Sequence, residues 1–346
     1  MSKRLTRIIA TNLISASLLA LVPLSSAQAA EFTIRLGHLW PAVSGPHKNL
    51  IQPWADKIEA ESGGRISIEV YPSGTLAKPP AQYDAVKNGI MDATATVQGY
   101  SANRFPLTQI VELPGVAKNA VNGSCILQSL LDEKLIAAEY EDTKPIFLYT
   151  HGPGLLHTKD KLIKVPADLS GLRIRRPTTV VAELLTELNA QPVGMPAPGS
   201  YPSMQRGVID GVAFPWEAMA SFRLNELANT HTEVGGLYTL SFIVTMNKNT
   251  YDALPADLQT VIDKNSGLAW AKKAGEVFDA LDNVGKQQAI DAGHTIYTID
   301  GGAENPAWKP LLDKASKTYI DALEANGLPA KQVYNRAKAL AESCTS

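Results

Sequence analysis

The sequence predicts an α/β protein made of two lobes. Strand-like and helical segments alternate over residues 32–150, which favours a mostly parallel sheet covered by helices. About 316 residues follow the N-terminal leader, more than one hydrophobic core usually organises. Three arginines lie in a further strand-like segment, residues 172–176, directly before a helix. Ligands of open α/β sheets bind at such strand ends, where the helix N-terminus also favours an anion.

The first lobe opens with a β–α–β pattern. Residues 32–37 alternate and stop at a glycine, residues 47–62 carry apolar side chains at helical spacing, and residues 66–71 alternate again. The pattern continues with a helix over 81–88, a strand over 91–97, a short extended segment over 111–115, a helix over 122–140 and a strand over 146–149.

The character of the chain changes at residues 152–154, Gly-Pro-Gly, where we place the first crossing between lobes. The arginine strand follows, then a helix capped by Thr178 or Thr179. After them come a strand over 208–213, a strand-like segment over 237–246 and a helical region from 255 to about 292 that is long enough to brace both lobes. We assign residues 30–151 and about 237–279 to lobe I, 152–236 and about 280–330 to lobe II, and 331–346 to a C-terminal tail.

Residues 1–29 have the features of a secretory signal peptide. Basic residues at the start precede a largely apolar stretch over 8–24, and Ala27-Gln28-Ala29 forms a small-residue cleavage site. A membrane anchor is the alternative, but polar residues interrupt the apolar stretch and it is short for a span. We therefore expect an exported protein in the periplasm.

The charges and cysteines narrow the possible partners. The 32 basic and 34 acidic residues nearly balance, so the basic surface of a nucleic-acid binder is not expected. The partner is predicted to be a small molecule. Cys125 and Cys344 either form a disulfide that ties the C-terminal tail to lobe I or remain unpaired thiols, and the sequence leaves both open.

No standard catalytic, cofactor or metal-binding motif occurs in the chain. The sequence has no Gly-x-Ser-x-Gly elbow, no His-Glu-x-x-His, no phosphate-binding loop and no Cys/His cluster at zinc spacing. The six histidines are scattered. We therefore predict a binding protein that is no enzyme and has neither catalytic residues, cofactor nor metal. A solvated charge cluster is the alternative interpretation of the arginine segment.

Several segments together resemble one family, the DctP-like periplasmic solute receptors of TRAP (tripartite ATP-independent periplasmic) transporters. The matching stretches are residues 63–76 (GGRISIEVYPSGTL), 86–92 (VKNGIMD), 112–114 (ELP), 165–175 (VPADLSGLRIR), 192–196 (PVGMP) and 201–211 (YPSMQRGVIDG). The resemblance implies a two-lobe periplasmic binding protein fold with several interlobe crossings and a long helix that spans both lobes. It also implies hinge closure of the two lobes around a solute, as in other periplasmic binding proteins, and delivery to the permease subunits of the membrane. We expect a monomer.

In this family the arginine at the end of the Leu-x-x-Arg strand pairs with the carboxylate of the solute, and that position is Arg175. A planar guanidinium suits this role because two parallel N–H donors match two carboxylate oxygens. Arg173 and Arg176 are expected to be solvated or structural.

The chain also departs from the family pattern. Many members carry a second arginine after the lobe crossing, where this sequence has Gly-Pro-Gly-Leu-Leu at 152–156. Phe214 stands at a position that is polar in many members, and Val97 replaces the acid of some sugar-acid receptors. Lost polar partners disfavour a heavily hydroxylated sugar acid.

The resemblance and its departures together predict a receptor for a small monocarboxylate with an apolar or aromatic body. The candidate binding residues are Arg175, Phe214, Trp40, Trp216, Tyr238, Phe242, Gln98 and Leu39. Core packing is the alternative role of each aromatic side chain. Two alternatives for the whole chain stay open: an exported enzyme that acts on a small carboxylate through a non-standard site, and a receptor that presents its ligand to a sensor protein.

Overall fold

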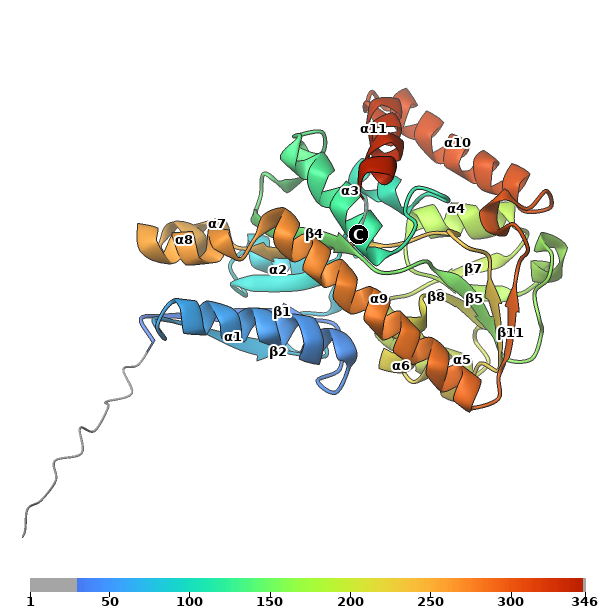
Figure 1. Ribbon diagram of the computed structural model, residues 1–346, viewed down its shortest axis with the longest axis horizontal. Helices are drawn as coiled ribbons and strands as arrows, with labels where there is room; N and C mark the ends of the chain where they lie inside the picture. Colours follow the sequence, from blue (N-terminus) through green and yellow to red (C-terminus); the bar gives the residue numbers. More distant parts are fainter. Residues whose placement is uncertain (1–29, 345–346) are drawn as a thin grey trace, which may run out of the picture.

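The computed structural model describes residues 30–344, so the predicted signal peptide at residues 1–29 lies outside the described part. Two sheets form the cores of two lobes (Figure 1). The sheet of lobe I has the order β2-β1-β3-β10-β4. Its strands are β1 (Phe32–His38), β2 (Ile66–Tyr71), β3 (Ala93–Val97), β4 (Lys144–Thr150) and β10 (Ser241–Met246). β1 runs parallel to β2 and β3, whereas β10 is antiparallel to β3 and β4.

The sheet of lobe II has the order β11-β9-β5-β8-β6-β7. Its strands are β5 (Leu155–Thr158), β6 (Arg173–Arg176), β7 (Gln191–Gly194), β8 (Gly211–Phe214), β9 (Thr230–Glu233) and β11 (Thr295–Thr298). β6 pairs in parallel with β7 and β8, so the arginine strand lies inside the sheet. The chain passes from lobe I to lobe II after β4 and back again before β10.

Helices cover both sheets (Figure 1). They are α1 (Gln52–Glu61), α2 (Gln82–Lys87), α3 (Ala120–Asp132), α4 (Thr179–Glu187), α5 (Ser200–Gln205), α6 (Trp216–Ser221), α7 (Lys248–Asp252), α8 (Ala256–Lys264), α9 (Gly267–Asp291), α10 (Lys309–Ala325) and α11 (Ala330–Ser343). None of the helices within residues 30–344 combines the length and apolar character that a membrane crossing requires.

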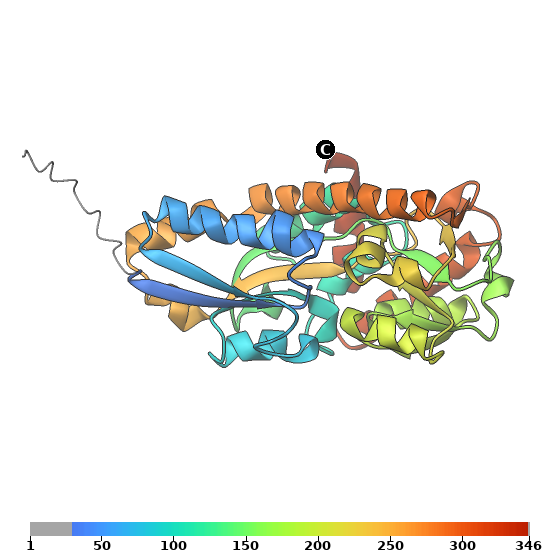
Figure 2. The same cartoon turned by 90° about the horizontal axis from the view of Figure 1, so that it is seen from below.

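Helix α9 runs along both lobes (Figures 1 and 2). Two of its glycines sit at close backbone contacts. A Cβ at Gly275 would lie 2.6 Å from the Cα of Val121 in α3, and a Cβ at Gly285 would lie 2.2 Å from the carbonyl oxygen of Trp216 in α6. Only glycine allows backbones to approach this closely, so α9 is fixed to one helix of each lobe.

The C-terminal helix returns to α3. Cys125 in α3 and Cys344 form a disulfide bond, which resolves the alternative that the sequence left open. The side-chain amide of Asn122 adds hydrogen bonds to the carbonyl oxygens of Ala341 and Cys344, at 3.0 and 2.8 Å. α11 is thus tied to lobe I by covalent and polar contacts.

Three predicted elements differ from the structure. The segment at 111–115 is not extended: residues Thr108–Glu112 form a 3₁₀ helix, which places the buried carboxylate of Glu112 against two segments. Ser241 donates to Glu112 through its backbone N–H (3.1 Å) and its hydroxyl (2.7 Å), and the Thr178 hydroxyl donates to it at 2.9 Å. These long-range partners cannot be read from local sequence.

The other two differences concern helix lengths. The region from 255 to 292, predicted as one helix, consists of two helices, and the helix predicted over 122–140 is shorter. α8 ends at Lys264, and α9 begins at Gly267, which has φ +67° and follows extended Ser266. The carbonyl of Asn265 at this break accepts a hydrogen bond from the Trp54 indole at 2.9 Å. α3 ends at Asp132, and Lys134 follows in a left-handed conformation at φ +63° before a short 3₁₀ turn.

Candidate functional site

Strand β6 and the start of α4 position Arg175. Ile174 and Arg175 are fully buried, and Arg175 lies between Val212 of β8 and Val193 of β7 in the sheet. The Thr178 hydroxyl accepts a hydrogen bond from the Val181 backbone and caps α4. The local sequence thus forms the strand end and helix start that it predicts.

The guanidinium of Arg175 is held from three sides. Its Nε donates to the carbonyl of Met195 at 3.0 Å, Nη1 to the carbonyl of Ala213 at 3.1 Å, and Nη2 to the hydroxyl of Tyr100 at 3.0 Å. Its Cζ lies 4.1 Å from the ring centroid of Phe214, a cation–π geometry. These contacts use three of the five N–H donors and leave one on each terminal nitrogen.

Arg175 has no acidic partner among residues 30–344 within ion-pair distance, although it is fully buried. Its neighbour Arg173 differs: its guanidinium pairs with Asp210 at 2.6 Å on a partly exposed surface. A buried charge without a counter-charge is costly. The two free N–H groups of Arg175 are therefore suited to bind the two oxygens of a carboxylate.

A cavity beside Arg175 lies between the two lobes. Lobe I contributes Leu39, Trp40, Val97, Tyr100, His151, Leu240 and Phe242, and lobe II contributes Ala197, Phe214, Pro215, Glu217, Ala218 and Phe222. The free volume is only about 20 Å³, so side chains fill most of the space. A solute can enter only if the lobes or these side chains move apart.

Aromatic rings form the wall of the cavity on the side of lobe I. The Trp40 ring stacks on Phe242 with centroids 5.6 Å apart, and Phe242 stacks on Tyr149 at 5.1 Å. Phe278 of α9 packs edge-on against Trp40 at 6.2 Å. On the side of lobe II, Phe214 is parallel to Phe222 at 6.2 Å. The wall is therefore suited to the flat faces of an aromatic or apolar body.

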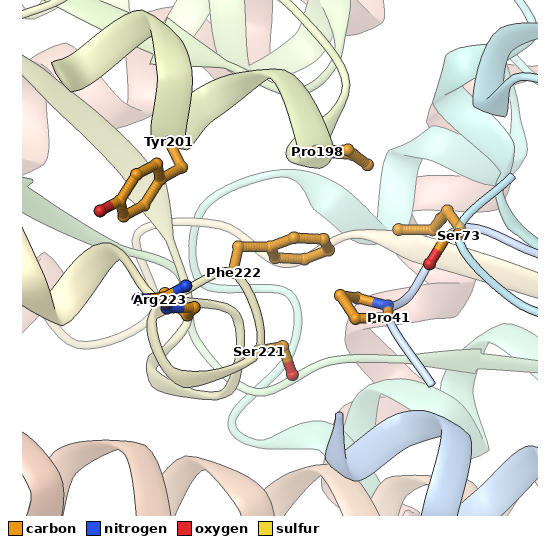
Figure 3. A pocket seen from close by; sticks show the side chains of 8 residues that line it. Pro41, Ser73, Pro198, Tyr201, Ser221, Phe222 and Arg223 are labelled. Carbon is orange, nitrogen blue, oxygen red and sulfur yellow. The ribbon is translucent and has the colours of Figure 1, made fainter. Parts of the chain in front are cut away.

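An open groove of about 260 Å³ adjoins this cavity (Figure 3). Leu39 and Phe222 line both spaces. In Figure 3, the Phe222 ring extends between Pro198 and Pro41, with Tyr201 and Arg223 on its other side. The shared side chains separate the cavity from the outer groove, so Phe222 is positioned at its mouth.

The structure brings five of the eight predicted binding residues together. Leu39, Trp40, Phe214 and Phe242 line the cavity, and Arg175 stacks on Phe214. Tyr238 is not a lining residue, but its ring packs against His151 at 5.8 Å and occupies the space beside Gly154, where a Cβ would lie 2.1 Å from it.

Two predicted residues lie elsewhere. The Trp216 indole donates to Glu233 at 3.0 Å and lines a different pocket, because the ring turns towards α9. The Gln98 amide donates to the Tyr140 hydroxyl inside lobe I. The sequence positions of Trp216 and Gln98 suggested a place in the binding site, but the direction of each side chain depends on tertiary contacts.

Sequence reasoning missed four polar or aromatic residues of the cavity: Tyr100, His151, Glu217 and Phe222. Burial raises the pKa of Glu217 to about 7, and the Ser221 hydroxyl donates to its carboxyl group at 2.5 Å. Burial, aided by the charge of Arg175, lowers the pKa of His151 to about 3. His151 directly precedes the Gly-Pro-Gly crossing, a signal that could have drawn attention to it.

Within the described residues 30–344, no three His, Cys, Asp or Glu side chains are grouped closely enough to hold a metal ion. The chemistry that the site offers is therefore a buried guanidinium, a few hydrogen-bonding groups and aromatic surface.

Comparisons with known proteins identify a matching family and solved structures with the same fold. Residues 36–320 match the family described as bacterial extracellular solute-binding protein, family 7 (DctP). A TRAP solute-binding protein from Rhodoferax ferrireducens, solved in complex with copurified benzoate, is 38% identical at a TM-score of 0.87, over 90% of this chain and 98% of that one.

Two further solved structures are similar. A marine metagenome TRAP solute-binding protein, described as specific for aromatic acid ligands and co-crystallised with 3-hydroxybenzoate, is 37% identical at a TM-score of 0.89, over 92% of this chain and 100% of that one. One from Bordetella bronchiseptica with bound (R)- and (S)-mandelate is 26% identical at a TM-score of 0.82, over 90% of this chain and 99% of that one.

Proposed function

Because this chain belongs to family 7 of the bacterial extracellular solute-binding proteins, the DctP-like receptors of TRAP transporters, we propose that it binds a small aromatic monocarboxylate between its lobes. The lobes close around the acid and present it to the membrane subunits of a TRAP permease. The chain acts as a monomer in the periplasm and releases its ligand chemically unchanged.

The environment of Arg175 is the observation that carries this proposal. The guanidinium is fully buried, is oriented by three protein acceptors, and keeps one N–H on each terminal nitrogen for a ligand. Binding a carboxylate supplies the missing counter-charge. Its planar, two-oxygen shape matches the remaining N–H pair better than a single-atom anion does.

The apolar wall favours an aromatic body for the acid. Trp40, Phe242, Phe214 and Phe222 present ring surface to the cavity, and offset or edge-to-face contacts with a ligand ring add to the burial of apolar area. A sugar acid would leave several hydroxyl groups without partners here. The benzoate, 3-hydroxybenzoate and mandelate named for the similar proteins support the same ligand class.

The small cavity implies that binding is coupled to a change of conformation. With about 20 Å³ free, the described form cannot admit a benzene ring. Entry requires the lobes to separate, after which closure around the ligand replaces contacts among cavity side chains with contacts to the acid. Closure of this kind is common among binding proteins with two lobes.

Isothermal titration calorimetry against a panel of acids tests the proposal. We expect benzoate, hydroxybenzoates and mandelate to bind with lower Kd values than succinate, pyruvate and glucuronate. Chromatography of the released ligand should recover the acid unchanged, as expected of a receptor and not of an enzyme. Absence of binding by every carboxylate, or a preference for glucuronate, would contradict the proposal.

A further inference from the structure

His151 lies at the junction between the lobes, directly after β4, and lines the cavity. It is 2% exposed. Its ring packs edge-on against Tyr238 and Phe242, with centroids 5.8 Å away in both cases. These contacts fix the plane of the imidazole within the aromatic wall.

The hydrogen bonds of His151 define its tautomer. Nδ1 contacts the carbonyl oxygen of Gly152, and a carbonyl can only accept, so Nδ1 carries the proton. Burial and the charge of Arg175 keep the ring neutral at physiological pH. In a neutral imidazole protonated at Nδ1, Nε2 is an acceptor.

Nε2 of His151 is buried and has no hydrogen-bond partner within residues 30–344. A buried acceptor without a donor is unfavourable. The carboxylate of a bound acid cannot satisfy it, because an ionised carboxylate only accepts hydrogen bonds. A cationic donor on the ligand is disfavoured by the nearby charge of Arg175. Among the uncharged substituents of an aromatic acid, a hydroxyl group is a suitable donor.

We propose that His151 Nε2 accepts a hydrogen bond from a hydroxyl group of the solute, so that this receptor selects hydroxylated aromatic acids over their unsubstituted relatives. In this arrangement Arg175 pairs with the carboxylate, the aromatic wall packs against the ring, and His151 accepts a hydrogen bond from the hydroxyl group. The inference rests on the proposed function and specifies its ligand class.

Matched ligand pairs test the inference by calorimetry. Each of 2-, 3- and 4-hydroxybenzoate is compared with the corresponding fluorobenzoate, which is similar in size but cannot donate, and mandelate is compared with phenylacetate. We expect at least one hydroxylated acid to bind about tenfold more tightly than its partner, which is about 1.4 kcal/mol.

Two variants connect this preference to His151. In His151→Phe the ratio of the two Kd values should fall close to one, whereas His151→Gln, whose amide oxygen can accept, should retain part of the preference. Thermal unfolding of each variant without ligand verifies folding. If His151→Phe does not fold, the inference is tested by comparing the Kd ratios of wild type with those of His151→Gln, which should be smaller but still above one.

The outcomes separate this inference from the proposed function. Benzoate binding without any hydroxyl preference would overturn the role of His151 and leave the receptor for aromatic acids intact. A preference that persists in folded His151→Phe would also overturn it. Failure of every aromatic acid to bind would overturn both.

Discussion

Replacing Arg175 by glutamine should abolish most of the affinity for the acid. The glutamine side chain keeps two N–H donors, which can serve the carbonyls that Arg175 contacts, but it loses the positive charge and the two N–H groups that we propose bind the carboxylate. Removing one partner of a desolvated charge pair costs about 2–5 kcal/mol. The Kd for benzoate should therefore rise from about 30-fold to several thousand-fold.

Arg173→Gln is the matched control for this substitution. Arg173 belongs to the same strand, but its side chain is 41% exposed and pairs with Asp210 outside the cavity. A partly exposed pair contributes little to stability, about 0–1 kcal/mol, and no contact joins it to the cavity. We expect this variant to bind benzoate within about twofold of wild type.

Calorimetric titration measures both variants, and thermal unfolding without ligand establishes that each is folded. The reasoning is refuted if folded Arg175→Gln binds the acid within about threefold of wild type, because the buried guanidinium would then not be the anchor. Equal losses in the two variants would show instead that the strand, and not the ligand contact, was disturbed.

Two further predictions concern stability. Replacing both cysteines by serine removes a link between residues 219 positions apart and should lower the free energy of unfolding by about 2–5 kcal/mol; urea unfolding with and without reductant checks this, and a variant as stable as the oxidised wild type would contradict it. The second prediction concerns pH. Burial raises the pKa of Glu112 to about 7 from 4.5, so the folded state binds this proton more tightly than the unfolded state, and the contribution to stability is lost as pH rises from about 4.5 through 7. Relative to wild type, Glu112→Gln should gain up to about 3 kcal/mol between pH 4.5 and 8, and a difference that does not change with pH would count against this account.

Local sequence patterns were sufficient to predict the fold class and strand β6. Alternation, glycine stops and the Thr178 cap act over a few residues, so the β–α–β start and β6 could be predicted. The four-residue strands β5, β7, β9 and β11 were not predicted. Segments this short carry only a weak periodicity signal, although the equally short β6 and β8 were predicted. The break between α8 and α9 has a local signal, Gly267 directly after Ser266, which the prediction of one long helix overlooked. The hydrogen bond from the Trp54 indole to Asn265, 211 positions apart, is a tertiary contact that no local pattern encodes.

The distinction between local patterns and tertiary contacts also applies to the candidate binding site. Aromatic residues could be nominated from the sequence, but the direction of a side chain is decided by its tertiary partners. Trp216 turns to Glu233 and Gln98 to Tyr140, whereas Trp40 and Phe242 face the cavity. His151 was considered only as one of six scattered histidines, because its unpartnered nitrogen is visible only once the fold surrounds it.

The two glycine contacts of α9 restrict how the lobes can move. Backbones that touch at Gly275 and Gly285 cannot slide past each other without a clash, so a shearing motion along the helix is opposed at both ends. Rotation of the two lobes about α9 is compatible with both contacts.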